Sequence, residues 1–580
     1  MTPLSSITWG ASQADLNVTY SFFSEGITVE NDGESHTSTN IDPFVSGQIL
    51  SVFETISQYT NLTFSAATGA TDFQIMLTND LGEDTDGFMN PPAETNAGLG
   101  IFKAVPDALF EIGAYNYMVV VHEVMHGLGL AHPHDDGGGS DILAGVTESF
   151  DDYGDFDLNQ GVYTVMTYNN GFPLGDPAPD SKEYGYETGP MALDVAVLQA
   201  KYGANATWAS SDNAYEIVGT NAVGTGWTTI WDTAGTDTIS YDGPSNVTID
   251  LRPATLEYEV GGGGFASSVE GVAGGYTIAN GVTIENATGG SGNDMLTGNA
   301  LANVLDGGAG TDTAVYAGNQ NTYTLTLNKT GNTLSDRSAA DSGADTLLNM
   351  EFLSFDTGLS GNTFDLTKFA GTEDLTEDQM HSFVELYIAY FNRAPDAVGL
   401  NFWGTAFSTG TTLEQMATLF IDQDETRATY DASLSNADFV TAVYANVLGR
   451  VGDQAGIDFW LGNLENGSVG RDQFILGVLE GAKSPIDNAT AEQAAQQAVD
   501  QKYLSDKTDI GAHFAITKGL STVSEASAAL ALFDGTQASI TNAVSAIDEY
   551  FATASAADSG QFLMPLVGVL DDSFEMSMVA

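Results

Sequence analysis

Three histidines at close spacing, in the stretch HEVMHGLGLAHP, are the residues of this chain best suited to chemistry. His122 and His126 are four residues apart in an apolar run of helical period, so on a helix they share one face. Two imidazoles on one helical face can bind a single zinc ion. Gly129 follows three residues after His126, where a helix can end with a left-handed residue. The chain can then return His132 to the same ion as a third ligand.

Three histidine ligands leave one coordination position open to water, which is typical of a catalytic rather than a structural zinc site. Glu123 lies beside the first histidine and can reach a water molecule at that position. The alternative is that these are ordinary core or surface histidines, but the fixed positions of Gly129 and His132 argue against it. His134 precedes the stretch DDGGGSD and is predicted to be a solvated loop residue.

The elements that must position these residues are of mixed type. Strands are predicted at VTYSF and LTFSA and an amphipathic helix at VSGQILSVFETISQYT, so residues 1–208 are predicted to form an α+β domain. Residues 209–345 are rich in Gly, Thr, Asn and Asp and predict an all-β domain with tight turns. A short β segment or linker over 346–370 leads to an all-α region at 371–550, where apolar residues recur at helical spacing, and then to a tail at 551–580.

Two nonapeptides in the glycine-rich region fit the pattern GGxGxDxUx, at 289–297 and 307–315, with a degraded copy at 298–306 between them. Nine residues form one turn and one short strand, so two repeats form one coil of a parallel β-roll. Asp294 and Asp312 are 18 residues apart, one full coil, and their carboxylates can share a calcium ion. Carbonyl groups of the glycine turns can complete its oxygen shell. The alternative is a flexible Gly/Asn linker, which the register of the aspartates argues against.

The extended pattern HExxHxxGxxH is typical of metzincin zinc endopeptidases. The chain resembles the serralysin family in particular, because Pro133 follows the third histidine and the stretch YTVMTY offers a methionine turn with Met166 and Tyr168. The segment GPMALDVAVLQAKYGAN, residues 189–205, is similar to the helix after that turn in serralysins. The resemblance continues through the glycine-rich region to about residue 320, which is more than half of the chain.

The resemblance implies a role for each residue of this set. The three histidines would bind one catalytic zinc ion. Glu123 would be the general base that takes a proton from the attacking water and later passes it to the leaving amine. Tyr168 would be a switchable zinc ligand that stabilises the oxyanion, and Met166 would form the apolar floor beneath the metal. The strand NAGLGIFKAV, residues 96–105, would be the edge strand that pairs with an extended peptide.

The resemblance also implies several structural calcium ions in the glycine-rich region. The calcium-binding residues would be Asp232, Gly235, Asp237, Thr283, Glu285, Gly290, Gly292, Asp294, Gly307, Gly308, Gly310 and Asp312. The chain departs from the family where Ala234 replaces a glycine, and where Ala209, Ser211 and Asn213 replace an Arg-x-Gly-x-Thr segment. The second change removes the usual residues from one half of a calcium site, and the short roll predicts fewer calcium ions than in longer members.

The composition fits an exported calcium-binding protein. The chain has 15 basic and 78 acidic residues, a net charge of −63, which argues against nucleic acid and anionic membranes as partners. Without calcium, carboxylate repulsion would keep the repeats unfolded and secretable, and millimolar extracellular calcium would fold them. No N-terminal secretory signal or membrane-spanning apolar run is recognised. The resemblance implies a type I secretion machinery that reads the C-terminus, here DDSFEMSMVA. The absence of cysteine excludes disulfides and thiolate metal sites.

The helical region contains an internal repeat, in which YIAYFNRAPDAVGLNFW at 387–403 matches YANVLGRVGDQAGIDFW at 444–460. Four residues recur 57 positions later, namely Arg393, Asp396, Gly399 and Trp403 as Arg450, Asp453, Gly456 and Trp460. The region resembles a helical module of unknown function in secreted RTX and surface-layer-type bacterial proteins. We prefer a structural interpretation, with aromatic residues in the core and Arg/Asp fixing a turn, over a ligand site. By analogy, the module is a candidate anchor to a surface or matrix component.

Two functions of different classes stay open. The first is a secreted, calcium-stabilised zinc metalloendopeptidase, expected to be a monomer that acts on protein or peptide substrates. The second is a surface-layer-associated or adhesion protein whose protease-like domain is inactive. An inactive copy would be free to lose Glu123 or Tyr168, and both are present beside the three histidines, so the sequence favours the enzyme.

Overall fold

The computed structural model describes residues 2–171, 179, 181–338, 343–357, 363–486 and 488–570 of the chain. The chain divides into two compact units, Met1–Val315 and Tyr316–Ala580, and each is described here by itself. The stretch DDSFEMSMVA, in which an export signal is predicted, lies outside the described residues.

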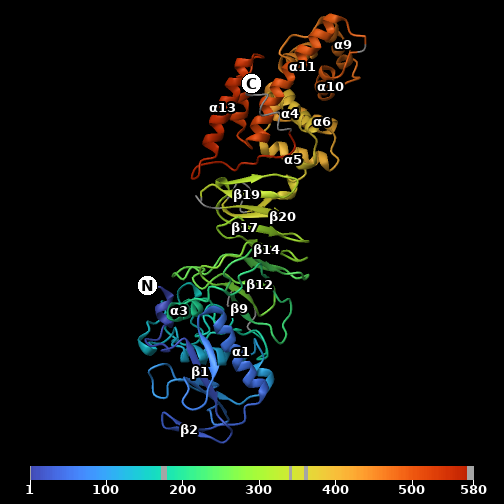
Figure 1. Ribbon diagram of the computed structural model, residues 1–580. Coiled ribbons are helices and arrows are strands. Elements are labelled where there is room, and N and C mark those ends of the chain that lie inside the picture. Colours follow the sequence, from blue (N-terminus) through green and yellow to red (C-terminus); the bar gives the residue numbers. More distant parts are fainter. Residues whose placement is uncertain are drawn as a thin grey trace. The chain divides into compact units, whose positions relative to one another are not determined.

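A five-stranded sheet organises the N-terminal part of the first unit (Figure 1). Its strands, in the order in which they lie side by side, are β4 (Thr63–Ala66), β1 (Asn17–Phe22), β5 (Phe73–Thr78), β7 (Leu99–Lys103) and β6 (Gly87–Met89). The first four are parallel, and β6 runs antiparallel to β7. A separate hairpin joins β2 (Thr28–Asn31) to β3 (Glu34–Thr37). The strands predicted at VTYSF and LTFSA are thereby confirmed as β1 and β4.

The prediction that residues 96–105 form the edge strand is wrong. The strand exists as β7, but it lies inside the sheet, where Gly100 pairs with Ile75 on one side and with Met89 on the other. The edge strand next to β7 is β6, and β4 forms the opposite edge of the sheet. Because β6 has only three residues, Gly87–Met89, it carries too little alternation of polar and apolar residues to be recognised in the sequence.

Three helices pack in this part of the chain, α1 (Pro43–Tyr59), α2 (Tyr115–Gly127) and α3 (Ala192–Tyr202). α1 confirms the predicted amphipathic helix. It begins where the Asp42 carboxylate accepts hydrogen bonds from the backbone N–H groups of Phe44 and Val45. α2 is buried along nearly its whole length, as its apolar sequence requires. Apolar side chains of all three helices join one core with those of the sheet.

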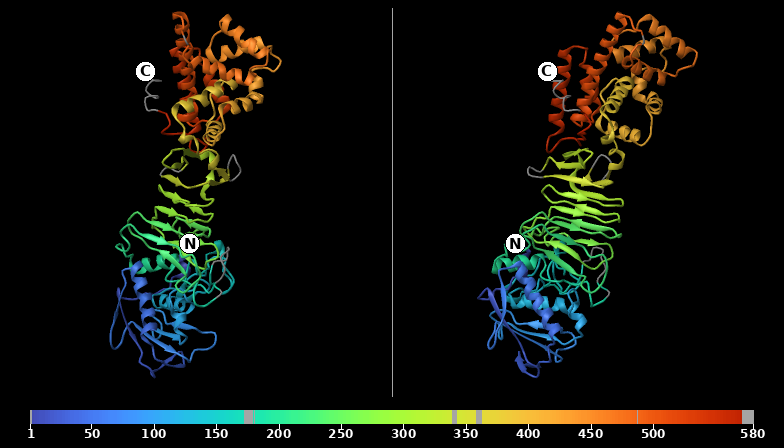
Figure 2. Two further views of the ribbon diagram at one scale, coloured as in Figure 1. Left: turned by 90° about the vertical axis from the view of Figure 1, so that its right-hand side faces the viewer. Right: turned by 45° about the vertical axis from the view of Figure 1, so that its right-hand side comes forward.

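Short strands from Ala214 onward lie one above another in two layers (Figure 2). One layer contains β8 (Ala214–Glu216), β10 (Thr238–Ser240), β14 (Asn286–Thr288) and β16 (Val304–Asp306), all parallel. The other contains β9 (Trp227–Ile230), β13 (Gly275–Ile278), β12 (Ser267–Val269), β11 (Val247–Asp250), β15 (Met295–Thr297) and β17 (Thr313–Asn319). The pairs Asn286↔Val304 and Met295↔Thr313 are each 18 residues apart, which confirms the predicted coil. The roll is not purely parallel, because β12 is antiparallel to both of its neighbours.

Glycine is required at the turns of this roll. Gly310 has a φ of +142°, and a Cβ there would lie 1.7 Å from the carbonyl oxygen of Gly292 in the turn one coil earlier. We expect Gly310→Ala to lower the free energy of unfolding by about 2–4 kcal/mol, from steric overlap and backbone strain together. Chemical denaturation in saturating calcium measures this free energy of unfolding. Gly82→Ala is the control, since Gly82 has open space around it, and equal losses in both variants would contradict the prediction.

The second unit begins with antiparallel strands and continues with helices. β18 (Tyr323–Thr326), β19 (Asn332–Asp336) and β20 (Ala344–Leu348) form one antiparallel set, and β21 (Phe352–Thr357) pairs with β22 (Thr363–Asp365). A segment near the end of the described chain lies beside β18, since the N–H of Leu325 donates to the carbonyl of Leu563 over 2.9 Å.

The α-helices in the described part of the second unit are α4 (Glu377–Phe391), α5 (Ala397–Ser408), α6 (Leu413–Ile421), α7 (Asp424–Thr429), α8 (Asn436–Leu448), α9 (Gln454–Glu465), α10 (Arg471–Lys483), α11 (Ala491–Ala512), α12 (Val523–Ala531) and α13 (Gln537–Ala554). The repeated motif spans α4–α5 and α8–α9. Among the described residues, no helix is both long enough and apolar enough to cross a membrane.

The repeated residues of the helical region have structural roles. Asp396 caps α5 by accepting from the N–H of Gly399 over 2.7 Å, and Asp453 caps α9 in the same way over 2.8 Å. Arg393 is buried and forms an ion pair with Glu425. Arg450 likewise pairs with a carboxylate, that of Asp500. These contacts support the structural interpretation of the repeat over a ligand site.

Candidate metal centre

The third histidine is brought back to the first two by the way α2 ends. Beyond its last turn, the N–H of Gly129 donates to the carbonyl of His126 over 2.9 Å, and the N–H of Leu130 donates to that of Met125 over 3.0 Å. This pair of bonds is a Schellman motif, which needs a left-handed residue, and Gly129 has a φ of +88°. A Cβ at Gly129 would also lie 2.3 Å from the carbonyl oxygen of Ala11. The predicted helix end is confirmed.

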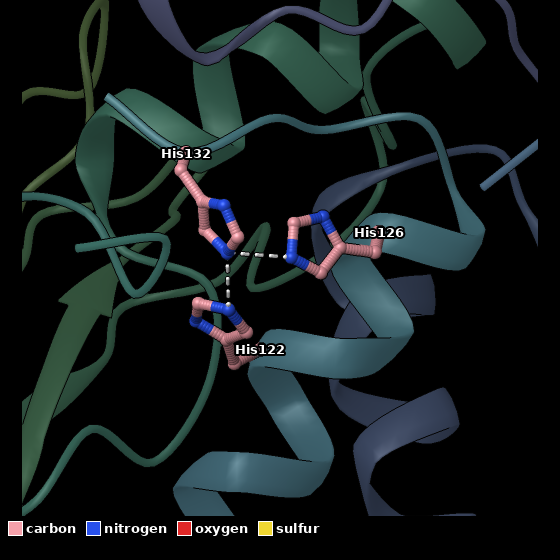
Figure 3. A group of neighbouring side chains, drawn as sticks. All are labelled: His122, His126 and His132. Atoms are coloured by element: carbon pink, nitrogen blue, oxygen red, sulfur yellow. Dashed lines mark hydrogen bonds between the residues drawn. The ribbon is translucent and has the colours of Figure 1, made fainter. Parts of the chain in front are cut away.

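The three histidines point their Nε2 atoms at one another (Figure 3). The Nε2 of His132 lies 3.2 Å from that of His122 and 2.9 Å from that of His126. The first two project from successive turns of α2, and the third comes from the loop. Separations of about 3 Å between imidazole nitrogens suit ligands that share one zinc ion at about 2.0–2.1 Å from each.

Each imidazole is held through its other nitrogen. The Nδ1 contacts are His122 to the carbonyl of Val165 at 2.7 Å, His126 to the carbonyl of Leu130 at 3.0 Å, and His132 to the carboxylate of Asp135 at 2.9 Å. These acceptors place the proton on Nδ1 and leave Nε2 as a bare donor atom for a metal. Burial lowers the pKa of His126 to about 3 and holds that of His122 well below its usual range. The residues present therefore fit a zinc ion.

Glu123 is fixed beside the histidines by the edge strand. Its Oε2 accepts a hydrogen bond from the backbone N–H of Met89 in β6 over 3.0 Å. Burial raises the pKa of Glu123 to about 8. Glu123 and His122 line a cavity of about 330 Å³, whose other walls come from the loop before β6 and from the segment around Tyr168. The carboxylate thus faces a space that a substrate side chain can enter.

Met166 and Tyr168 lie in one turn with different exposures. Met166 is fully buried in the core, which supports a packing role. The phenol oxygen of Tyr168 lies 3.2 Å from the Nε2 of His132, and 38% of this tyrosine is exposed. Burial, reinforced by the carboxylates of Glu123 and Asp135, raises the pKa of Tyr168 to about 12, so its hydroxyl keeps its proton and can donate it in a hydrogen bond.

Carboxylates predicted to bind calcium gather between successive turns of the roll. The Glu285 carboxylate accepts from the N–H of Asp237 over 2.7 Å, although the two are 48 residues apart. Burial raises the pKa of Asp237 to about 6, with further contributions from Asp232, Glu285 and Asp212. Asp212, which was not predicted to bind calcium, also has its carboxylate close to that of Asp237. Thr283 is exposed.

The second predicted calcium region is built as stacked turns. Asp294 accepts from the N–H of Gly290 over 2.7 Å, and the N–H of Asp294 donates to the carboxylate of Asp312 over 2.8 Å. A Cβ at Gly308 would lie 2.4 Å from the carbonyl oxygen of Gly290, so the turns approach closely. Close backbone approach also occurs at Gly235, Gly292 and Gly310, and the carbonyl of Gly307 lies beside Gly289.

The degraded repeat at 298–306 is held in the roll by hydrogen bonds of Asn303. Asn303 occupies the position that an aspartate has in the full repeats, nine residues from Asp294 and from Asp312. Its side chain accepts from the N–H of Asn299 over 2.8 Å and donates to the carbonyl of Glu285 over 3.1 Å. An amide therefore joins these turns by hydrogen bonds where a carboxylate would bring a charge.

Two stretches of the chain match known protein families. Residues 202–404 match the family described as Peptidase M10 serralysin C terminal, and residues 417–484 match a domain of unknown function, DUF4214. The metalloprotease AprA of Pseudomonas entomophila is 36% identical over 205 residues, which cover 33% of this chain and 39% of that protein. Serralysin of Photorhabdus luminescens is 35% identical over 206 residues, covering 34% and 38%.

A longer match is the metallopeptidase AprA of Pseudomonas marginalis, 28% identical over 316 residues, which cover 51% of this chain and 62% of that protein. The chain is thus similar to the serralysin family of metzincins, and its residues 202–404 match the C-terminal domain of that family. It spans about two fifths to three fifths of the length of these curated relatives. The resemblance stated from the histidine motif, the methionine turn and the glycine-rich repeats is confirmed, and so is the presence of the helical module.

One buried carboxylate near the histidines was not predicted from the sequence. Asp194, in the first turn of α3, accepts from the backbone N–H groups of Val165 at 2.8 Å and Met191 at 2.9 Å, and from the hydroxyl of Thr164 at 2.6 Å. The carbonyl of Val165 in turn accepts from His122, so Asp194 positions that histidine through the backbone of one residue, Val165. In the sequence, this role could have been suspected because Asp194 is a single carboxylate within the apolar run MALDVAVL.

The loop after the third histidine also differs from expectation. The prediction that His134 is solvated is wrong, because its side chain is only 5% exposed. Its ring stacks on His132 with centroids 4.8 Å apart and lies 4.5 Å from the ring of Tyr168. These two rings cover His134, while the N–H of Gly137 donates to the carboxylate of Asp135 over 2.9 Å in the same loop. Asp135, the partner of His132, was not predicted either.

Proposed function

We propose that this chain is a secreted, calcium-stabilised zinc metalloendopeptidase that hydrolyses peptide bonds of protein substrates. The observation that carries the proposal is the convergence of three imidazole Nε2 atoms beside Glu123, at the edge strand of a sheet and next to a cavity. Similarity to the serralysin family supports it, and relatives in that family are named metalloprotease and serralysin.

Different residues of the chain would carry out different steps of hydrolysis. His122, His126 and His132 would hold the zinc ion, which supplies Lewis-acid polarisation of the scissile carbonyl and acidifies water. Glu123 takes one proton from the attacking water and then gives it to the departing amine nitrogen, so the carboxylate returns to its starting state. Tyr168 donates a hydrogen bond to the oxygen on which negative charge develops. The edge strand β6 offers backbone groups to which an extended peptide can add.

The predicted calcium residues and the negative charge complete the proposal. Asp232, Asp237 and Glu285 form one candidate group, and Asp294 with Asp312 and the glycine turns forms another. Bound calcium would neutralise carboxylates that otherwise repel one another, and would couple folding of the roll to export into a calcium-rich medium. Export by a type I machinery and attachment through the helical module to a surface or matrix component belong to this proposal.

Selective removal of zinc tests the proposed activity. A zinc chelator with millimolar calcium present is expected to abolish hydrolysis of casein, because the Lewis acid is lost while the roll keeps its calcium. One equivalent of zinc should restore it. Zinc content is followed by mass spectrometry and folding by thermal denaturation. Full activity in zinc-free, folded protein would contradict the proposal, and an inactive, zinc-loaded wild type would favour the surface or adhesion protein.

A further inference from the structure

Two acidic residues line the cavity next to Glu123. They are Asp84 and Asp86, in the loop that leads into β6. An apolar part of the lining comes from Met118, Val119 and Phe150. With a volume of about 330 Å³, the cavity can hold one long side chain of a substrate. Its lining suits a side chain with an apolar stem and a charged end.

Asp86 already has partners within the chain. Its Oδ2 accepts a hydrogen bond from the hydroxyl of Tyr115 over 3.1 Å, and its Oδ1 lies 3.5 Å from the Nζ of Lys103. A second lysine, Lys182, lies over the ring of Tyr115, with its Nζ 3.9 Å from the ring centroid. Neither lysine lines the cavity. The charge of Asp86 is therefore offset from outside the cavity.

Asp84 is the carboxylate that stays available to a ligand. It is exposed, and within the described part of the chain its carboxylate has no hydrogen-bond or ion-pair partner. The loop around it is fixed, because the Nζ of Lys103 donates to the carbonyls of Gly82 and Glu83 over 3.1 and 3.2 Å. The N–H of Lys103 also donates to the carbonyl of Asp86 over 2.9 Å. β7 thus holds the loop on both sides of Asp84, so this charge is placed at the cavity before a ligand arrives.

We propose that Asp84 makes this cavity selective for a cationic side chain of the substrate, that of arginine or lysine. The proposal rests on the proposed peptidase function and names a substrate preference for it. His122 and Glu123 line the same cavity, so the side chain that enters it belongs to a residue next to the cleaved bond. The negative charge of Asp84 attracts a cation there and repels the carboxylate of an acidic side chain.

The rest of the lining fits the same kind of side chain. The methylene groups of arginine or lysine can pack on Met118 and Val119 while the charged end reaches towards solvent. The guanidinium group of arginine can also lie over the ring of Phe150, which is 64% exposed. Because Asp84 is exposed as well, solvent screens its ion pair, and we expect a preference of about fivefold rather than strict specificity.

Matched peptides with arginine, citrulline or glutamate on either side of one cleavable bond test the proposal. Citrulline has nearly the shape of arginine but no charge. With wild type, kcat/KM for the arginine peptide should exceed that for the citrulline peptide by about fivefold, and the glutamate peptide should be the slowest. Asp84→Asn should bring the ratio of arginine to citrulline close to one, and Asp84→Lys should invert it. Asp15→Asn makes the same change of charge at an exposed aspartate that does not line the cavity, and it should keep the wild-type ratio.

Each ratio compares two peptides on the same enzyme sample, so differences in zinc content or folding cancel. An arginine-to-citrulline ratio near one in wild type, or the wild-type ratio kept in Asp84→Asn, would overturn the selectivity and leave the peptidase standing. If wild type hydrolysed none of the peptides, their dissociation constants, measured by fluorescence anisotropy, would decide. Tighter binding of the arginine peptide that is lost in Asp84→Asn would sustain the selectivity and contradict the proposed activity. Equal dissociation constants would overturn both.

Discussion

Replacing Glu123 by glutamine is expected to lower kcat/KM for a peptide substrate by about 10²–10⁴-fold, the usual contribution of a positioned general base. The amide has nearly the size of the carboxylate, and its oxygen can still accept the hydrogen bond from the N–H of Met89. It cannot take a proton from water at neutral pH. The three imidazoles are untouched, so zinc content and thermal stability should stay close to wild type, and the loss should fall on kcat.

The control for this variant is Glu94→Gln, which makes the same change of charge at an exposed glutamate outside the group of residues around the histidines. Its activity should equal that of wild type. Steady-state kinetics on a fluorogenic peptide, with zinc quantified in each sample, makes the comparison. If Glu123→Gln kept most of its activity while zinc-loaded, the carboxylate would not be the base. If it lost its zinc, the result would report on the metal site rather than on proton transfer.

The parts of the site that follow from local spacing could be read in the sequence. His122 and His126 share a face of α2 because of helical period alone, and Gly129 is required by the left-handed turn that follows. The 18-residue coil of the roll could be predicted in the same way, because the aspartates and glycines repeat in the sequence with the same period as the paired strands. In both cases the period of the chain fixes which residues meet.

The parts that were missed depend on contacts between distant elements. Asp194 bonds to a backbone N–H 29 residues away, and no periodic pattern specifies which buried donor a lone carboxylate meets. β6 is placed at the edge by pairing with β7, not by a strand pattern of its own. His134 was predicted to be solvated because polar and glycine residues follow it, yet the rings of His132 and Tyr168 cover its ring. Burial is a property of the folded chain, and composition predicts it poorly for single polar residues.

Asp194→Ala is expected to weaken zinc binding although Asp194 touches no metal ligand. Its carboxylate holds the N–H of Val165, and the carbonyl of the same residue holds the Nδ1 of His122. Removing the carboxylate leaves buried N–H and hydroxyl donors without acceptors, so the free energy of unfolding should fall by about 2–5 kcal/mol. Release of the Val165 backbone should also raise the zinc Kd by about 10–100-fold, as for other indirect supports of metal-binding histidines.

Leu198→Ala is the control that separates an effect on zinc binding from an effect on stability. Leu198 is fully buried in the same helix, α3. Its truncation should lower the free energy of unfolding by about 2–5 kcal/mol, the usual range for Leu→Ala in a core. Leu198 makes no bond to the turn that holds His122, so its variant should keep the wild-type zinc Kd at a temperature where both variants are folded. Competition with a chromophoric chelator measures the two affinities, and denaturation measures the two stabilities. Equal zinc Kd values at equal loss of stability would mean that Asp194 acts only on the fold. A weaker zinc site in Asp194→Ala alone would establish that α3 positions His122 through the backbone of Val165.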